Sequence, residues 1–249
     1  FGVATALARA PEQVAAMKQA GWEIASHGLK WIDYKDYTPA EERAEIVQAI
    51  RMHEAVVGTP PSGWYTGRCS ENTVDLVAEQ GICTYQADSY ADDLPYYQDT
   101  PSGPQLMVPY TLDANDMRFA TPQGFNSGQQ FFDYLKDTFD VLYAEGIAGK
   151  ARIMNIGLHC RLAGRPGRLQ AVQSFIDYAA QKTGVWFASR LSIAECWQAA
   201  YPYRQVYRPS QMAKEEFVSA FGSVFEHSPW VAEQAYDTEI SPAIDTVTG

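Results

Sequence analysis

Short apolar segments that alternate with longer segments of helical periodicity constrain the fold of this chain more than any other feature. Strands are predicted within residues 22–28, 62–68, 81–90, 105–112, 151–161 and 185–191. Helices are predicted between them, within residues 11–21, 39–57, 72–81, 131–142 and 172–178. Strands that alternate with helices form parallel strand–helix–strand units. The sequence therefore predicts an α/β fold, built on either a sheet or a barrel.

The helix predicted at residues 39–57 has the clearest local signals. Thr38-Pro39-x-Glu41 has the form of a capping box, with proline at the first helical position. Apolar residues follow at helical spacing, and Gly58 is placed to end the helix. The start and the end of this helix are therefore both predicted from local chemistry.

The composition excludes several classes of function. A formal net charge of −11 argues against binding to nucleic acid, which requires clustered Lys and Arg. No apolar run is long enough to span a membrane, so we expect no membrane partner. The four cysteines show no C-x-x-C spacing, which disfavours a zinc finger or a disulfide framework. We expect reduced thiols, a cytoplasmic location and a homo-oligomer.

The composition changes near residue 200. Residues 201–209 are rich in Tyr, Arg and Pro and are predicted to be a linker between a first domain, residues 1–200, and a second, residues 210–249. In the second domain, Phe217, Phe221 and Phe225 share a helical face. Ser228-Pro229 has the form of a further helix start. We expect the beginning of an all-helical domain.

Four polar residues follow directly after predicted strands, where parallel α/β folds gather their reactive groups: His27, Arg68, Asp88 and His159. His159 could transfer a proton to a leaving nitrogen, or it could be a core histidine bonded to the backbone. Arg165, in the polar loop after it, could bind a ureido or carboxylate group, or face solvent.

His27 and Asp88 each allow two interpretations. A second histidine four residues after His27 would put two imidazoles within reach of one metal ion, but that position holds Trp31, whose indole cannot bind a metal. His27 could instead polarise a carbonyl or orient a water. Asp88 lies in an acidic cluster that could supply a base, or it could stabilise a surface turn.

Five motifs in this order closely resemble the cofactor-independent allantoinases of the polysaccharide-deacetylase superfamily: "SHGLKWIDY", "GWYTGRCSENT", "DSYADDLPYY", "VPYTLDANDMRF" and "GLHCRLAGRPGR". The resemblance covers residues 1–197 and implies a deformed (β/α) barrel whose first strands precede residue 1. It also implies an enzyme without metal or cofactor that hydrolyses allantoin to allantoate. Trp31 stands where the metal-dependent deacetylases have a histidine.

The resemblance implies a role for each candidate residue. His159 would be the acid, and His27 would be catalytic. Substrate contacts would come from Arg68, Asp88, Trp31 and Arg165. The family's first motif, which carries an acidic pair and would supply the general base, is expected before Phe1.

The tail resembles a different family. "EEFVSAFGSVFEHSPWVAEQAY", residues 215–236, is similar to the opening of the ureidoimidazoline decarboxylases of urate breakdown, with His227 and Trp230 matching its motif. A decarboxylase that makes allantoin, fused to an enzyme that opens it, is a coherent hypothesis. The alternatives are a metal-dependent deacetylase of chitin or peptidoglycan, and a non-catalytic scaffold.

Overall fold

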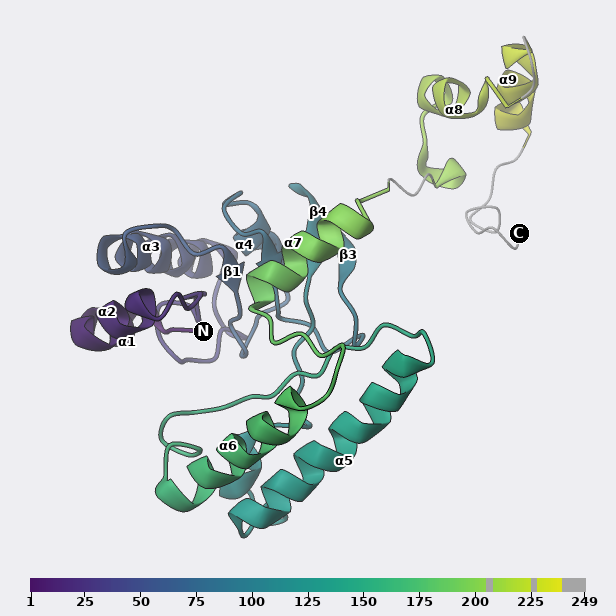
Figure 1. Cartoon of the computed structure of the whole chain (residues 1–249). Coiled ribbons are helices and arrows are strands. Elements are labelled where there is room, and N and C mark those ends of the chain that lie inside the picture. The colour runs from purple at the N-terminus through teal and green to yellow at the C-terminus, as the bar shows by residue number, and fades with distance from the viewer. Residues whose placement is uncertain (205–207, 225–227, 239–249) are drawn as a thin grey trace. The chain divides into compact units, whose positions relative to one another are not determined.

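The chain divides into two compact units, Phe1–Pro202 and Tyr203–Gly249. The computed structural model describes residues 1–204, 208–224 and 228–238 (Figure 1). Phe225 and His227, which the sequence analysis assigned to a helical face and a motif, lie outside the described residues.

A four-stranded sheet in the order β1-β2-β4-β3 forms the centre of the first unit. Its strands are β1 (Gly63–Trp64), β2 (Tyr85–Gln86), β3 (Tyr96–Thr100) and β4 (Gly103–Met107). β1, β2 and β4 are parallel, and β3 pairs with β4 as an antiparallel hairpin. Single parallel bridges join Gly2 to Ser26 and Ser26 to Trp64, which extends the parallel run beyond β1. Helices and a largely parallel sheet confirm the predicted α/β class.

Seven α-helices of the first unit are described: α1 (Ala4–Arg9), α2 (Pro11–Gln19), α3 (Pro39–Val57), α4 (Thr73–Ala78), α5 (Gly128–Ile147), α6 (Pro166–Ala180) and α7 (Arg190–Ala200). The signals predicted for α3 are present. Thr38 accepts the Glu41 backbone N–H and Glu41 accepts the Thr38 N–H, while Gly58 ends the helix at φ 97°. The capping-box prediction is confirmed.

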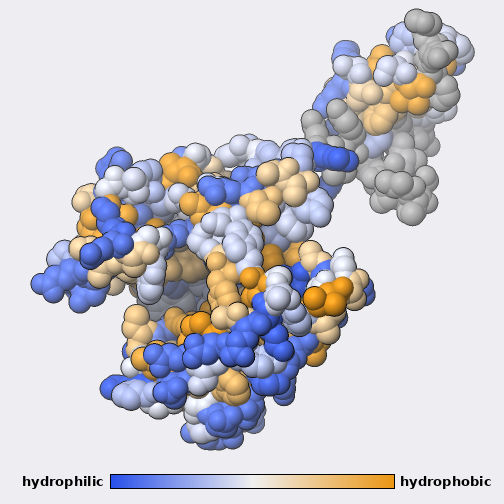
Figure 2. Space-filling model, in the orientation of Figure 1, coloured by the Kyte–Doolittle hydropathy of each residue, from blue (hydrophilic) through white to orange (hydrophobic). Residues whose placement is uncertain are grey.

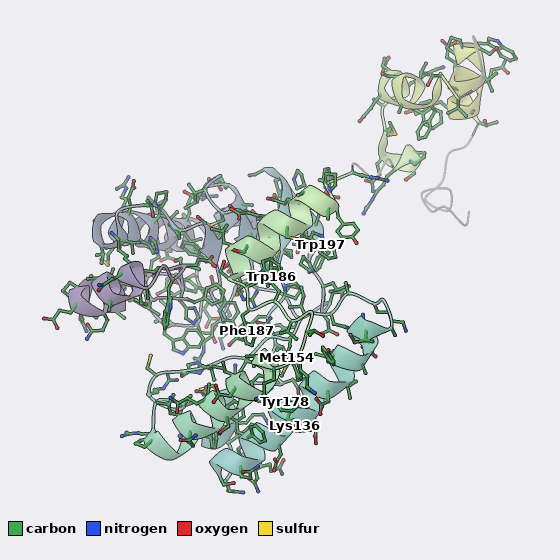
Figure 3. The ribbon with its side chains drawn as sticks, viewed as in Figure 1. Lys136, Met154, Tyr178, Trp186, Phe187 and Trp197 are labelled. Atoms are coloured by element: carbon green, nitrogen blue, oxygen red, sulfur yellow. The ribbon has the colours of Figure 1, made fainter. Side chains whose placement is uncertain are left out.

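Three predicted strands are wrong. Residues 151–161 run without a strand and make one isolated bridge, between Gly157 and Asn115. Residues 185–189 have no strand, and Arg190 begins α7. Residues 22–28 also form no strand and make only isolated bridges, at Ser26. All three segments contain apolar residues, but a strand also needs a neighbour that pairs with its backbone along its length. Trp186 and Phe187 on the second segment are 59% and 58% exposed (Figure 3).

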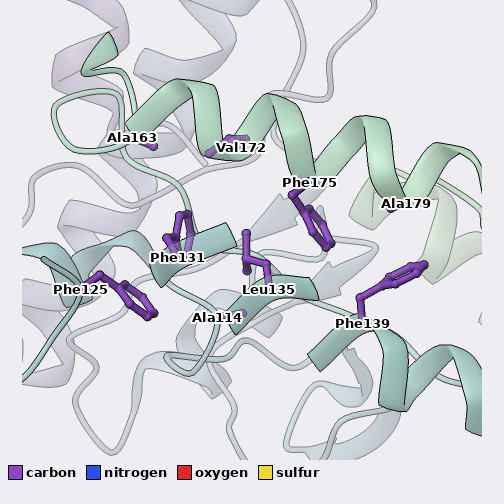
Figure 4. Close-up of a cluster of buried hydrophobic side chains, with 9 residues drawn as sticks. All are labelled: Ala114, Phe125, Phe131, Leu135, Phe139, Ala163, Val172, Phe175 and Ala179. Atoms are coloured by element: carbon purple, nitrogen blue, oxygen red, sulfur yellow. The ribbon is translucent and has the colours of Figure 1, made fainter. Parts of the chain in front are cut away.

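The α5–α6 pair has its own hydrophobic core. Phe131, Leu135 and Phe139 of α5 face Val172 and Phe175 of α6 (Figure 4). The helical spacing of the three α5 residues, seen in the sequence, is therefore the spacing of a buried face. A second core cluster, with Ile46, Ala49, Trp64 and Leu76 among its members, packs α3 against β1 and α4. The surface of the first unit is hollowed between the α5–α6 pair and the helices around α3, and hydrophobic side chains gather along this hollow (Figure 2).

The second unit contains α8 (Lys214–Phe221) and α9 (Pro229–Asp237), preceded by the short 3-10 helix η2 (Pro209–Gln211). Met212, Phe217 and Ala232 form its small buried cluster. The regular elements described in this unit are all helices. In the part of the chain that the structure describes, no helix has the length and apolarity that crossing a bilayer requires.

Candidate active site

A carboxylate–imidazole pair lies at the start of the loop after residue 157. Asp116 Oδ1 lies 2.6 Å from His159 Nδ1, and Asp116 Oδ2 accepts the backbone N–H groups of His159 at 2.7 Å and Ala163 at 3.0 Å. Asp116 is fully buried, whereas the His159 side chain is 29% exposed. A carboxylate beside Nδ1 stabilises the imidazolium and directs Nε2 outward as the proton donor. This geometry favours the acid interpretation of His159 over a core histidine.

Local structure explains how Asp116 is positioned. It is the first residue of the 3-10 helix η1 (Asp116–Ala120), and Asn115 caps that helix by accepting the Met117 N–H at 2.9 Å. Asn115 also donates to the Tyr110 hydroxyl at 2.9 Å and bridges to Gly157. A Cβ at Gly157 would lie 2.1 Å from Asn115 Nδ2, so only glycine allows the two segments to approach this closely.

The sequence analysis did not single out Asp116, although it quoted the segment that contains it. The usable signal was Asn115-Asp116, a helix-capping pair that follows the predicted strand at 105–112. The partner of such a pair, 43 residues further along the chain, cannot be read from local sequence.

His27 is held by a backbone carbonyl. Its Nδ1 lies 2.5 Å from the oxygen of Tyr65, and its ring stacks on the Tyr65 ring at a centroid distance of 5.1 Å. The Trp31 and His27 rings also meet edge-on, with their centroids 4.6 Å apart. Burial in this aromatic surrounding lowers the pKa of His27 from 6.5 to about 4. His27 is therefore neutral at physiological pH.

Three tyrosines continue the wall beside His27. Tyr65 is buried and stacks on Tyr110 at 4.4 Å, and its hydroxyl lies 2.8 Å from that of Tyr90. Tyr90 is 55% exposed and meets Tyr110 edge-on. Burial raises the pKa of all three phenols, so they remain neutral hydrogen-bonding groups. Flat aromatic faces with polar edges suit a planar, polar ring as ligand.

Asp88 shapes the loop that carries Arg68. Its two carboxylate oxygens accept the backbone N–H groups of Thr66 and Gly67, each at 2.7 Å. Burial raises the pKa of Asp88, while the two amides act in the opposite direction. With both oxygens occupied by the backbone, the geometry favours the turn-stabilising interpretation. Asp88 is a positioning residue for this loop.

Arg68 and Trp31, which are distant in sequence, meet at the surface. The Arg68 guanidinium lies 5.4 Å from the centroid of the Trp31 ring, and both side chains are exposed. Gly67 adopts φ +80°, and a Cβ there would lie 2.9 Å from the Trp31 ring. The backbone conformation at Gly67 therefore determines how closely the Trp31 ring can approach, and the Trp31 ring in turn contacts the Arg68 guanidinium. Trp31 therefore contacts both His27 and the Arg68 guanidinium.

Arg190 supplies a second cation that the sequence analysis missed. It donates to the carbonyls of Val108 and Pro109 at 2.7 and 3.1 Å, and to Asn155 Oδ1 at 2.7 Å. Its guanidinium also lies 5.6 Å from the centroid of the Tyr110 ring. As the first residue of α7, within a predicted strand, it had no recognisable signal. Arg190 joins α7 to the segment that follows β4.

Arg165 lies apart from these contacts. It occupies the position before the first residue of α6, where its side chain makes no capping hydrogen bond, and it is exposed. None of its described contacts brings it to His159 or His27, so its predicted substrate contact stays a prediction. A hollow of about 440 Å³ lies beside residues 35–39 and 69–72, and none of the six predicted site residues lines it.

The described residues do not fit a divalent metal. Among them, no three His, Cys, Asp or Glu side chains converge as a metal site requires. Trp31, in contact with His27, is a donor only and cannot be a ligand.

Comparison with known proteins identifies the family. The model of the polysaccharide deacetylase family matches residues 1–85. A protein of Schizosaccharomyces pombe (strain 972), provisionally named polysaccharide deacetylase, is 40% identical over 221 residues, which cover 82% of this chain and 69% of the yeast protein. The chain belongs to the polysaccharide deacetylase family of hydrolases.

Two solved structures are more similar in sequence. A probable polysaccharide deacetylase from Pseudomonas aeruginosa PAO1 is 51% identical, with a TM-score of 0.79. PuuE allantoinase is 53% identical, with a TM-score of 0.80. Each similarity covers 82% of this chain and 68% of the other chain.

Proposed function

We propose that this protein hydrolyses a C–N bond of a cyclic amide, opening the hydantoin ring of allantoin to give allantoate. The observation that carries the proposal is the Asp116–His159 pair, with Nδ1 held by a buried carboxylate at 2.6 Å. Opening an amide requires a proton at the leaving nitrogen, and an imidazolium held in this way is suited to deliver it. The 53% identity to PuuE allantoinase supports allantoin as the substrate.

The surroundings suit such a substrate. Allantoin is a planar ring with a ureido arm, and it carries carbonyl oxygens that accept hydrogen bonds. The exposed rings of Trp31 and Tyr90 provide flat surfaces, and Arg68 provides a forked donor against Trp31. Arg165 could contact the ureido arm if its exposed side chain turns toward the site.

A second candidate is an N-deacetylase of chitin or peptidoglycan. The names of the Pseudomonas aeruginosa and Schizosaccharomyces pombe proteins favour it. That reaction also needs a proton at the leaving nitrogen, so the Asp116–His159 pair serves both candidates. The two candidates differ because the deacetylase reaction would require a metal ion. Among the described residues, no group of three His, Cys, Asp or Glu side chains could bind one.

The deciding experiment measures turnover of allantoin and of an N-acetylated chitin oligomer by the protein. Both assays follow exhaustive chelation, with metal content determined on the same sample. Full allantoin turnover at negligible metal is expected. Chitin deacetylation that vanishes on chelation and returns with zinc would instead establish the second candidate.

We also propose that the helical second unit begins a decarboxylase-like domain that supplies allantoin. Its separate cluster of Met212, Phe217 and Ala232 supports an independent domain. Decarboxylation of the ureidoimidazoline by the parent protein, and its loss on truncation after Pro202, would test this. The expected homo-oligomer is tested on the same sample by light scattering.

A further inference from the structure

The buried face of α3 contains a carboxylate. Ile46, Ala49 and Val57 lie on this face at helical spacing, and Glu42 continues the same row toward the start of the helix. Glu42 is 1% exposed. Burying a carboxylate is unfavourable unless hydrogen-bond donors surround it. Because an apolar residue would suit this row better, the carboxylate of Glu42 must do more than fill space.

Two hydroxyl groups from the loop after Arg68 supply the donors. Ser70 Oγ donates to Glu42 Oε2 at 2.5 Å, and the hydroxyl of Thr73 donates to Glu42 Oε1. Thr73 is fully buried and is the first residue of α4. An ionised carboxylate can only accept, so both hydroxyl protons are directed to Glu42.

The orientation of these hydroxyls in turn fixes the backbone of the loop. With its proton directed to Glu42, each hydroxyl oxygen has lone pairs left for backbone N–H groups. Thr73 Oγ1 accepts the Ser70 N–H at 2.9 Å, and Ser70 Oγ accepts the Asn72 N–H at 2.9 Å. Glu42 therefore holds residues 70–73 through two hydroxyls and two backbone amides.

Arg68 lies between this anchored segment and another. On its N-terminal side, Asp88 accepts the backbone N–H groups of Thr66 and Gly67. On its C-terminal side, the loop borders the hollow of about 440 Å³, so neighbouring side chains do not confine it there. The contacts with Glu42 therefore limit the conformations of the loop on this side of Arg68.

The same helix holds the segment that carries Trp31. Glu45 of α3 accepts the hydroxyl proton of Tyr34 at 2.9 Å, and the Tyr34 backbone N–H donates to the Arg68 carbonyl at 3.1 Å. α3 thus fixes both segments whose side chains meet, with the Arg68 guanidinium 5.4 Å from the centroid of the Trp31 ring.

We propose that Glu42 is a positioning residue for Arg68, which fixes residues 70–73 so that the guanidinium is held against Trp31 at the substrate site. The inference rests on the proposed function, in which Arg68 binds the substrate. Without the carboxylate, the two hydroxyls lose their acceptor and the loop gains other conformations. Substrate binding then weakens, while His159 and Asp116 keep their contacts.

A double-mutant cycle with Arg68 tests this role. Glu42→Gln keeps the shape of the side chain, but its amide nitrogen cannot accept a hydroxyl proton, so one hydroxyl loses its acceptor. We expect KM for allantoin to rise about tenfold and kcat to change much less. In the Arg68→Ala background, Glu42→Gln should leave KM unchanged, because the residue through which Glu42 acts is absent. A further rise of the same size in that background would overturn the proposal.

Two more variants support the cycle. Glu54→Gln is the matched control, because Glu54 is exposed on the same helix and its carboxylate has no partner among the described residues. Its KM should equal that of the wild type, and a rise equal to that of Glu42→Gln would overturn the proposal. Thr73→Val removes the other partner of a Glu42 contact and keeps the side-chain shape. It should show the same dependence on Arg68 even if Glu42→Gln does not fold.

Hydrogen exchange is a readout independent of turnover. The backbone amides of Ser70 and Asn72 should exchange about tenfold faster in Glu42→Gln than in the wild type, while that of Leu135 in the α5–α6 core should not change. Unchanged exchange at Ser70 and Asn72 would overturn the proposal. If the wild type does not hydrolyse allantoin but exchange is faster as expected, the proposed function is rejected and the anchoring of the Arg68 loop by Glu42 stands.

Discussion

Asp116 and His159 are joined twice, once through the ring nitrogen Nδ1 and once through the backbone N–H, with one carboxylate oxygen serving each. The carboxylate therefore determines both where the imidazole lies and which of its nitrogens faces outward. A histidine positioned only by packing would have neither constraint. The double contact makes Asp116 the first residue to test.

Asp116→Asn should reduce kcat strongly while leaving the fold intact. The asparagine oxygen can still accept the backbone N–H groups of His159 and Ala163, but its amide opposite Nδ1 favours the wrong tautomer of His159. We expect a loss of about a hundred- to ten-thousandfold in allantoin turnover with a small change in KM. Steady-state kinetics and circular dichroism on the same preparation provide the measurement.

Asp116→Ala serves as the matched comparison. It leaves two backbone N–H groups without an acceptor, each of which costs about 1–3 kcal/mol when buried. Its unfolding midpoint in urea should therefore fall well below that of Asp116→Asn. Equal stability of the two variants would contradict the described hydrogen bonds.

Gly67→Ala should destabilise the protein and weaken substrate binding. Gly149→Ala is the control, because Gly149 has a similar positive φ, +87° against +80°, but no atom within 4 Å of its Cβ position. The backbone strain, about 1 kcal/mol, is therefore common to both variants. Only Gly67→Ala also displaces Trp31 and, with it, Arg68.

Comparison of urea midpoints and of KM for allantoin checks this difference. We expect both variants to be less stable and only Gly67→Ala to show a raised KM. An equal KM in the two variants would show that the contact between Trp31 and Gly67 has no part in substrate binding.

Arg68→Ala should raise KM more than it lowers kcat, because the guanidinium lies beside the site and not at the reacting atoms. Arg68→Lys keeps the charge but loses the forked donor geometry, so it should recover little of the affinity. If Arg68→Lys had the KM of the wild type, the positive charge alone would account for the contribution of Arg68 to substrate binding. Steady-state kinetics of the two variants distinguishes these outcomes.

His27 should make the protein less stable in acid. Its folded-state pKa is lowered from 6.5 to about 4, so between these values the unfolded chain binds a proton that the folded chain does not. The free energy of unfolding therefore decreases as pH falls through this window, by about 1.4 kcal/mol per pH unit at most. His27→Asn removes this contribution.

Urea unfolding of the wild type and His27→Asn at several pH values between 6.5 and 4 gives the difference directly. Other titrating groups are shared by the two proteins and cancel. The stability of the wild type relative to the variant should decrease toward pH 4. A constant difference would show that His27 keeps its ordinary pKa in the folded protein.

Local sequence was informative where local chemistry decides the structure. Thr38, Glu41 and Gly58 predicted the bounds of α3 because capping groups and a left-handed glycine act on their own neighbours. Residues 151–161 and 185–191 were predicted to be strands because they are apolar and run into polar loops. A strand, however, is defined by the partner with which it pairs, and apolar character says nothing about that partner.

The sequence by itself determined the α/β class, the bounds of α3, and the placement of His27 and His159 after apolar segments, because these depend on periodicity and on neighbouring residues. The tertiary structure alone decided which residues act together. Asp116 meets His159, Asp88 holds the loop of Arg68, and a carbonyl 38 residues away places the proton of His27. Such contacts depend on how distant segments are aligned in space, and that alignment arises only when the whole core packs.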